Sequence, residues 1–233
     1  IINALSGDIL NEQCFRYAYD KRRRIILKQV PGGGINSLVY DARDRMVFLQ
    51  DANGKLRNEW QTTLYDIDNR EVLTGLINFT GTREALQSLV NTSTSTSSVT
   101  EPNTIIEGVT INRNPLPAGS QLYPLEVTYF DNYDWAAGLN NALKTFEVGS
   151  ISGSLIPASN NIWPYAQPLA ASSKVLNAVT GKKIRLLKVS PDKFLVSVYF
   201  YDSEGRTILQ RSDNISGGID AVRTQSSLDA SPL

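Results

Sequence analysis

A short pattern occurs four times in this chain of 233 residues: a tyrosine, an aspartate directly after it, and an arginine four positions past the aspartate. Each copy stands between two β-prone runs, so it marks a turn that joins two strands. The tyrosines of the first three copies are spaced by 21 and 25 residues, the length of one hairpin with its connection. The copies are Tyr19, Asp20 and Arg24; Tyr40, Asp41 and Arg45; Tyr65, Asp66 and Arg70; and Tyr201, Asp202 and Arg206.

Each residue of the pattern has a physical role in a hairpin. An aspartate at the first position of a turn accepts hydrogen bonds from backbone N–H groups two or three residues further on. The arginine opens the returning strand, where its guanidinium can meet that aspartate or a neighbouring carbonyl. The tyrosines lie on one face and form a ladder of rings with polar tips. Because a lone hairpin is marginal in water, such units must pair edge to edge.

The sequence therefore predicts a mainly β fold, an antiparallel series of hairpins forming a twisted sheet that is able to curl, with a short helix and irregular insertions. Residues 1–80 are expected to hold the first hairpins, 81–104 a helix at 82–90 and a Ser/Thr-rich loop, and 105–233 further strands, an irregular aromatic insertion and a final hairpin. Tyr129-Phe130-Asp131 resembles a degenerate copy of the pattern.

Composition argues against several kinds of chemistry. Lys plus Arg and Asp plus Glu both total 23, so no long-range charge favours nucleic acid, and the basic run 21–24 is expected to be a solvated turn. The chain has no histidine, the commonest general base and metal ligand, and Cys14 is its single cysteine. We expect no metal, no cofactor and no enzymatic activity. No run of 18 apolar residues occurs, so membrane insertion is not expected.

Three other features have a structural and a functional interpretation. Gly32-Gly33-Gly34 could bind phosphate but is expected to be a wide turn, because a strand follows it. Residues 51–54 could bind calcium but are expected to form an Asx turn. Paired acidic residues could serve a carboxylate hydrolase, although turn capping explains them. These pairs are Asp41 with Asp44, Asp66 with Asp68, and Asp131 with Asp134.

The aromatic residues of the insertion offer an alternative function. Trp135, Trp163 and Tyr165 lie in an irregular stretch rich in Gly, Asn and Pro. Exposed rings of this kind stack on sugars, which would make the chain a carbohydrate-binding or adhesion module with glycans as partners. Packing of the same rings against the sheet is the structural alternative.

The repeated pattern resembles the YD repeat of bacterial RHS proteins, most clearly in Tyr201-Asp202-Ser203-Glu204-Gly205-Arg206. The similarity extends from about Cys14 to Thr224. It implies a non-enzymatic structural segment of a large secreted or cell-surface protein, whose sheet forms a shell or scaffold for toxin delivery. The implied partners are the rest of the polypeptide and neighbouring YD repeats. The Asp-Pro dipeptide of the self-cleaving cores in this family is absent, so neither autoproteolysis nor toxin activity is implied.

Overall fold

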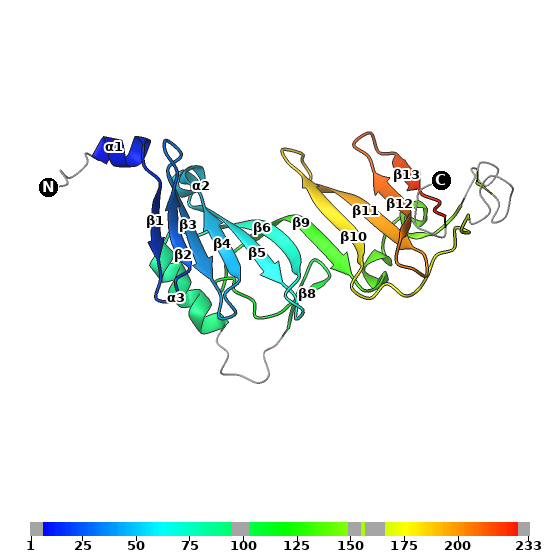
Figure 1. Cartoon of the computed structure of the whole chain (residues 1–233), viewed down its shortest axis with the longest axis horizontal. Coiled ribbons are helices and arrows are strands. Elements are labelled where there is room, and N and C mark those ends of the chain that lie inside the picture. The colour runs from blue at the N-terminus through cyan, green and yellow to red at the C-terminus, as the bar shows by residue number, and fades with distance from the viewer. Residues whose placement is uncertain (1–6, 95–102, 149–154, 157–165, 228–233) are drawn as a thin grey trace. The chain divides into compact units, whose positions relative to one another are not determined.

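The computed structural model describes residues 7–94, 103–148, 155–156 and 166–227, and its backbone is mainly antiparallel β-sheet (Figure 1). The chain divides into two compact units, Ile1–Leu125 and Glu126–Leu233. Each unit is described by itself below.

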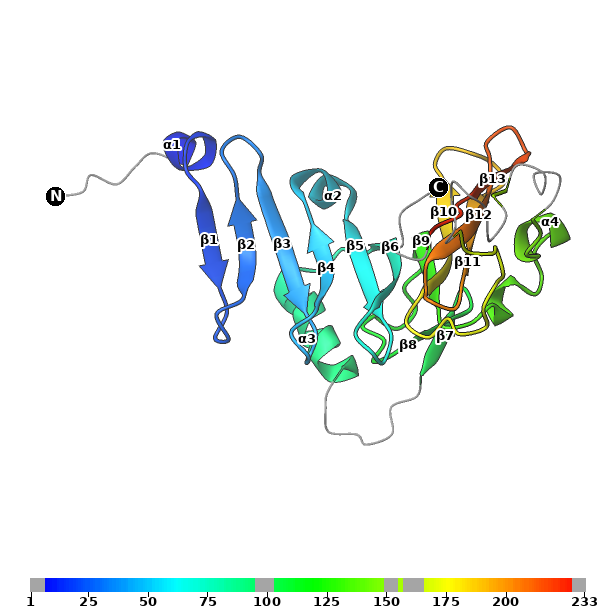
Figure 2. The same ribbon diagram turned by 45° about the vertical axis from the view of Figure 1, so that its right-hand side comes forward.

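The first unit contains six consecutive strands, each antiparallel to the next. They are β1 (Arg16–Tyr19), β2 (Ile25–Gln29), β3 (Ile35–Tyr40), β4 (Met46–Gln50), β5 (Glu59–Tyr65) and β6 (Glu71–Asn78). The three turns that carry the repeated pattern join β1 to β2, β3 to β4 and β5 to β6, and they lie side by side at the same end of these strands (Figure 2). An unbroken meander therefore brings alternate turns together. The neighbour of β6 is β9 (Leu122–Phe130), which begins in the first unit and ends in the second.

One face of this sheet is covered by helix α3 (Arg83–Ser93), which confirms the short helix and extends it to 11 residues. Thr82 caps its N-terminus by accepting the Ala85 N–H at 3.2 Å. Gln87 then bonds both backbone groups of Tyr40, taking the Tyr40 N–H at 3.1 Å and donating to its carbonyl at 2.6 Å. The core beneath is buried and consists of Val39, Val47, Phe48, Trp60, Tyr65, Ile77, Leu86 and Val90.

Three segments of the first unit differ from the sequence-based expectation. Residues 51–54 were expected to turn, but they begin helix α2 (Ala52–Arg57), because the Asp51 carboxylate accepts the Gly54 N–H at 2.6 Å as an N-cap. In residues 104–112, where the sequence pattern indicates one continuous strand, the chain forms a hairpin of β7 (Thr104–Ile106) and β8 (Val109–Ile111), because Glu107 and Gly108 adopt positive φ. Helix α1 (Gly7–Glu12) was not expected.

The second unit continues the meander from β9. Its further strands are β10 (Val179–Leu186), β11 (Lys193–Tyr201), β12 (Thr207–Asp213) and β13 (Ile219–Arg223). The last of these was not expected. Between β9 and β10 runs a long insertion with the short helices η1 (Asp134–Ala136) and α4 (Asn141–Lys144). The insertion packs Tyr133, Leu139, Leu143 and Phe146 on the face formed by Val198, Phe200 and Leu209.

Candidate functional site

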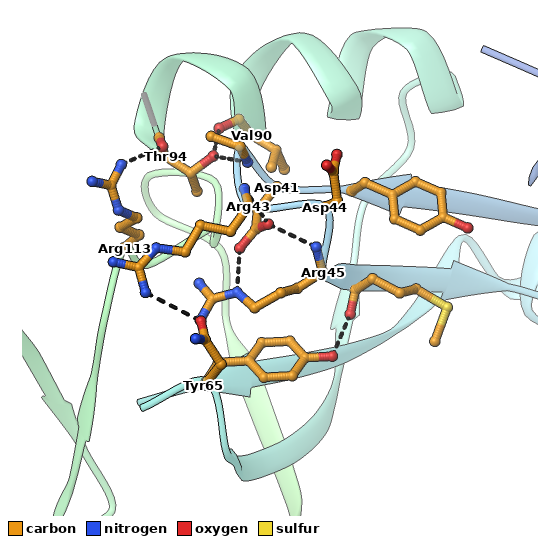
Figure 3. Close-up of polar contacts among 12 residues, drawn as sticks. Asp41, Arg43, Asp44, Arg45, Tyr65, Val90, Thr94 and Arg113 are labelled. Carbon is orange, nitrogen blue, oxygen red and sulfur yellow. Dashed lines mark hydrogen bonds and ion pairs between the residues drawn. The ribbon is translucent and has the colours of Figure 1, made fainter. Parts of the chain in front are cut away.

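The four turns share one set of hydrogen bonds, seen most clearly between β3 and β4 (Figure 3). Asp41 Oδ1 accepts the Arg43 and Arg45 N–H groups, both at 2.9 Å, and Oδ2 accepts Arg45 Nε at 2.7 Å. The Asp41 N–H bonds the Arg45 carbonyl at 3.0 Å and closes the turn. The same set recurs around Asp20 with Arg24, Asp66 with Arg70, and Asp202 with Arg206.

These bonds correct one detail of the sequence-based interpretation. The aspartate receives the N–H groups two and four residues further on, rather than two and three. The third residue has a positive φ, between 63° and 79° in the four copies, so its N–H points to the aspartate's carbonyl instead. Asp44, Asn69 and Gly205 suit this conformation, whereas Arg23 does not.

A β-bulge accompanies each of the four turns, on the returning strand beside the partner of the motif tyrosine. Tyr40 pairs with Met46 while Val39 pairs with Phe48, so that Val47 is the extra residue of the returning strand. The same offset leaves Ile26, Val72 and Ile208 as the extra residues of the other three copies. All four are Ile or Val two positions past the motif arginine. This position was not predicted, although an apolar β-branched residue at a fixed distance from the arginine is a signal visible in the sequence.

Two of the motif arginines, Arg24 and Arg45, also contact the next turn along the sheet. Arg24 lies with its guanidinium carbon 4.7 Å from the centre of the Tyr40 ring, and Arg45 lies at the same distance from Tyr65. The Arg24 guanidinium donates to the Asp41 carbonyl at 3.4 Å, and Arg45 donates to the Asp66 carbonyl at 3.4 Å. The arginine therefore joins its own turn to the following one.

The hydroxyls of Tyr40 and Tyr65 form hydrogen bonds in the opposite direction, to the preceding hairpin. Tyr40 Oη donates to the Ile25 carbonyl at 2.8 Å, and Tyr65 Oη donates to the Met46 carbonyl at 3.0 Å. In both cases the acceptor is the residue directly after the previous arginine. Burial raises the pKa of Tyr65 to about 12, so the hydroxyl keeps its proton well into the alkaline range.

The motif aspartates are paired with arginines in this setting. Asp41 has no exposed side-chain surface and Arg45 only 9%, so they form a buried, hydrogen-bonded ion pair. For Asp20, burial raises the pKa, but hydrogen bonds from the Arg24 N–H and guanidinium outweigh it and hold the pKa below the ordinary value. The carboxylates are thus occupied by turn bonds and arginines.

The hairpin of β9 and β10 is a fifth copy whose turn has been opened by the insertion. Phe130 pairs with Val179 and Tyr129 with Gly181, which places the bulge at Thr180. The Asp131 N–H bonds the Ala178 carbonyl at 3.2 Å, as the aspartate and arginine do in an intact turn. Tyr201 Oη donates at 2.6 Å to the carbonyl of Val179, the residue after Ala178. Ala178 therefore occupies the arginine position.

The two outer edges of the sheet differ in whether another segment of the chain covers them. On β1, Tyr19 and Tyr17 are 58% and 45% exposed, and no described segment lies beyond this strand. At the other edge, Arg206 donates to the Ser227 carbonyl at 3.1 Å. Arg24 and Arg45 donate in the same way to the backbone carbonyl of the next motif aspartate. Ser227 also forms a β-bridge with Ala166 of the insertion. The β1 edge is thus the one that displays its motif tyrosine.

Of the three proposed sugar-stacking residues, the structure describes Trp135. Trp135 stacks on Tyr129 with ring centres 4.1 Å apart, donates Nε1–H to Thr180 Oγ1 at 3.1 Å, and packs against the core of the second unit. One face of its ring is therefore occupied within the protein. Trp163 and Tyr165 lie outside the described residues.

The remaining candidate sites are occupied by local structure where the chain is described. Gly32-Gly33-Gly34 joins β2 to β3, with positive φ at Gly32 and Gly34. Asp44 pairs with Arg22 and Arg24, both at 2.7 Å, and Asp68 pairs with Arg70 at 3.5 Å. Over the described ranges, the structure has no cluster of three His, Cys, Asp or Glu suited to a metal and no helix long and apolar enough to cross a membrane.

Comparison with known proteins shows a distant structural similarity. No family model and no curated protein matches the sequence. A solved structure titled "Crystal Structure of TcdB2-TccC3-TEV" is similar over 94% of this chain, at 13% sequence identity and a TM-score of 0.36. The chain corresponds to 8% of that chain's length.

Proposed function

We propose that this chain is a non-enzymatic structural module: a stretch of YD-type sheet that belongs to a large exported bacterial protein and extends by adding hairpins at its edge. One observation carries the proposal, namely the repetition of the same contacts between successive turns. Arg24 and Arg45 each join their own aspartate, the next tyrosine ring and the next carbonyl. A contact set that repeats along one axis suits a scaffold that grows by stacking.

The chemistry of the turns supports a structural role over catalysis. Each motif aspartate accepts two backbone N–H groups and one guanidinium, and Asp41 is inaccessible to solvent. A hydrolase would need a pair of carboxylates that face a substrate. The class of parent protein rests on the resemblance of the repeated pattern to RHS proteins, and the secreted or cell-surface location follows from that resemblance.

The open edge supports extension toward the N-terminal side. Phe15, Tyr17 and Tyr19 are 65%, 45% and 58% exposed, whereas the corresponding motif tyrosine Tyr65 is 9% exposed. Unpaired strand edges with exposed aromatics are sites for further strand addition. A preceding hairpin would pair with β1 as β2 pairs with β3, and it would cover the side chains of Phe15, Tyr17 and Tyr19.

A tethered hairpin tests the proposal. A copy of residues 193–213, which contain β11, the fourth turn and β12, is joined ahead of Ile1 through a flexible linker, which gives it a high effective concentration at β1. Hydrogen–deuterium exchange should show slower exchange of the β1 amides that do not bond to β2. A Gly/Ser tether of equal length is the matched control. Equal exchange of β1 with the two tethers would contradict the proposed edge pairing.

A further inference from the structure

In the second and third turns, the third residue after the motif aspartate receives arginines from the preceding turn. Asp44 accepts Arg22 and Arg24, both at 2.7 Å. These donors stand two and four residues after Asp20. In the next turn, Asn69 accepts Arg43 and Arg45, both at 3.1 Å, from the same two positions. A polar or acidic residue at the third position thus meets two cations from the turn before it.

The first turn reverses this charge. Its third residue is Arg23, which is exposed and has a φ of 63°, a conformation in which a long side chain is strained. The Arg23 N–H closes the turn on the Asp20 carbonyl, but none of the described residues gives the Arg23 side chain a hydrogen bond or ion pair, while Arg22 and Arg24 on either side of it are held by Asp44. A preceding turn with arginines at both donor positions would place three guanidinium groups together, which like-charge repulsion disfavours.

This chain also contains turns with the opposite charge at a donor position. The second residue after the motif aspartate is Asp68 in the third turn and Glu204 in the fourth, where Arg22 and Arg43 stand in the first two. Glu204 pairs with Arg206 of its own turn at 3.1 Å and is exposed. Placed before β1, such a turn would bring a carboxylate to Arg23.

We infer that the partner of the β1 edge is a YD hairpin with an aspartate or glutamate two residues past its motif aspartate, and that Arg23 selects it. The inference rests on the proposed edge pairing and adds the chemistry of the partner. The register follows from the two intact interfaces, in which Arg24 lies over the Tyr40 ring and Arg45 over the Tyr65 ring. The partner's arginine then lies over the Tyr19 ring, and Tyr19 Oη donates to the carbonyl after that arginine.

A charge exchange tests this selection with the tether of residues 193–213. The original tether carries the copy of Glu204, and a second tether carries Glu204→Arg. Each is joined to the chain with Arg23 and to the variant Arg23→Glu, and exchange of the β1 amides is measured in all four. Both Arg23 forms are first measured without a tether, so that any change in the first hairpin itself is subtracted.

The expected result is a reciprocal pattern. With Arg23, the glutamate tether should protect β1 about two- to fivefold more than the arginine tether, the size expected of a partly exposed ion pair. With Arg23→Glu the preference should reverse, and both differences should shrink in 0.5 M salt because exposed charges are screened. Equal protection by both tethers would overturn the inference and leave edge pairing intact. Protection by neither would overturn both.

Discussion

The turn between β3 and β4 and the turn between β9 and β10 begin alike and end differently. In the first, Asp41 receives two N–H groups and a guanidinium from residues within four positions. In the second, Asp131 bonds the Ala178 carbonyl through its N–H and accepts the Asn177 N–H at 2.6 Å, with the insertion between them. The bulge is the same in both. The closing backbone bond and the bulge therefore define the repeat, and the arginine is replaceable.

The bulged residue shows how the interrupted copy was adapted. Where the intact copies have Ile or Val, this hairpin has Thr180, which is fully buried. Its hydroxyl donates to the Asn132 carbonyl at 2.6 Å and accepts Trp135 Nε1–H at 3.1 Å, so it fastens both the start of the insertion and its tryptophan. A hydroxyl is needed here because the insertion brings polar groups to a buried position.

The largest difference between the two turns should appear on removing their aspartates. Asp41→Ala leaves the Arg45 guanidinium buried without its carboxylate and should cost about 4 kcal/mol of unfolding free energy, whereas Asp131→Ala should cost about 1 kcal/mol. Hydrogen–deuterium exchange of the β3–β4 and β9–β10 peptides measures the loss of stability in each hairpin separately. Equal losses at the two turns would show that the arginine adds no stability to the intact copy.

The insertion should depend on its tryptophan. Trp135→Ala removes the stacking on Tyr129 and the bond to Thr180, and should destabilise the second unit by about 3 kcal/mol. Denaturant unfolding followed by exchange of β10 and β11 measures this effect. Trp135→Phe keeps a ring and loses the hydrogen bond, so it should recover part of the stability. Wild-type stability of Trp135→Ala, together with loss of glycan binding, would instead favour the carbohydrate-binding alternative.

Alkaline pH should affect both units through buried tyrosines. Burial raises the pKa of Tyr65 and of Tyr133 to about 12. Because the unfolded chain releases these protons near pH 10, each tyrosine stabilises the fold fully below that pH and loses its contribution as pH rises through 12. The expected loss is on the order of 2 kcal/mol per residue at pH 12. The measurement is an absorbance titration at 295 nm, which follows tyrosine ionisation. Tyr65→Phe and Tyr133→Phe should each remove one tyrosine that ionises late from the titration curve.

The smallest effect concerns the hydroxyl that reaches the interrupted copy. Tyr201→Phe removes the bond to the Val179 carbonyl and should cost about 1 kcal/mol, the same as Tyr65→Phe in the intact series. Thermal unfolding of the two variants compares them directly. A negligible cost for Tyr201→Phe alone would mean that the opened hairpin no longer works as a repeat.

Much of this architecture could be predicted from the sequence, because turn chemistry is local. The aspartate, the positive-φ residue and the arginine lie within five positions, so Asp20, Asp41, Asp66 and Asp202 identified their turns without tertiary information. The short helix after β6 also followed from local periodicity. By contrast, residues 51–54 were misread, since the same Asp-x-Asn-Gly letters suit a turn or a helix cap.

The sequence by itself determined that hairpins repeat and where each one bends, since those choices depend on neighbouring backbone groups. Only the tertiary structure decided which groups meet between hairpins. Arg24 finds Tyr40 and Asp44 across two strands, and Asp131 finds Ala178 beyond the whole insertion, through pairings that no spacing rule specifies. The charge reversal at Arg23 likewise acquired meaning only once Asp44 and Asn69 were seen to receive the arginines of the turn before them.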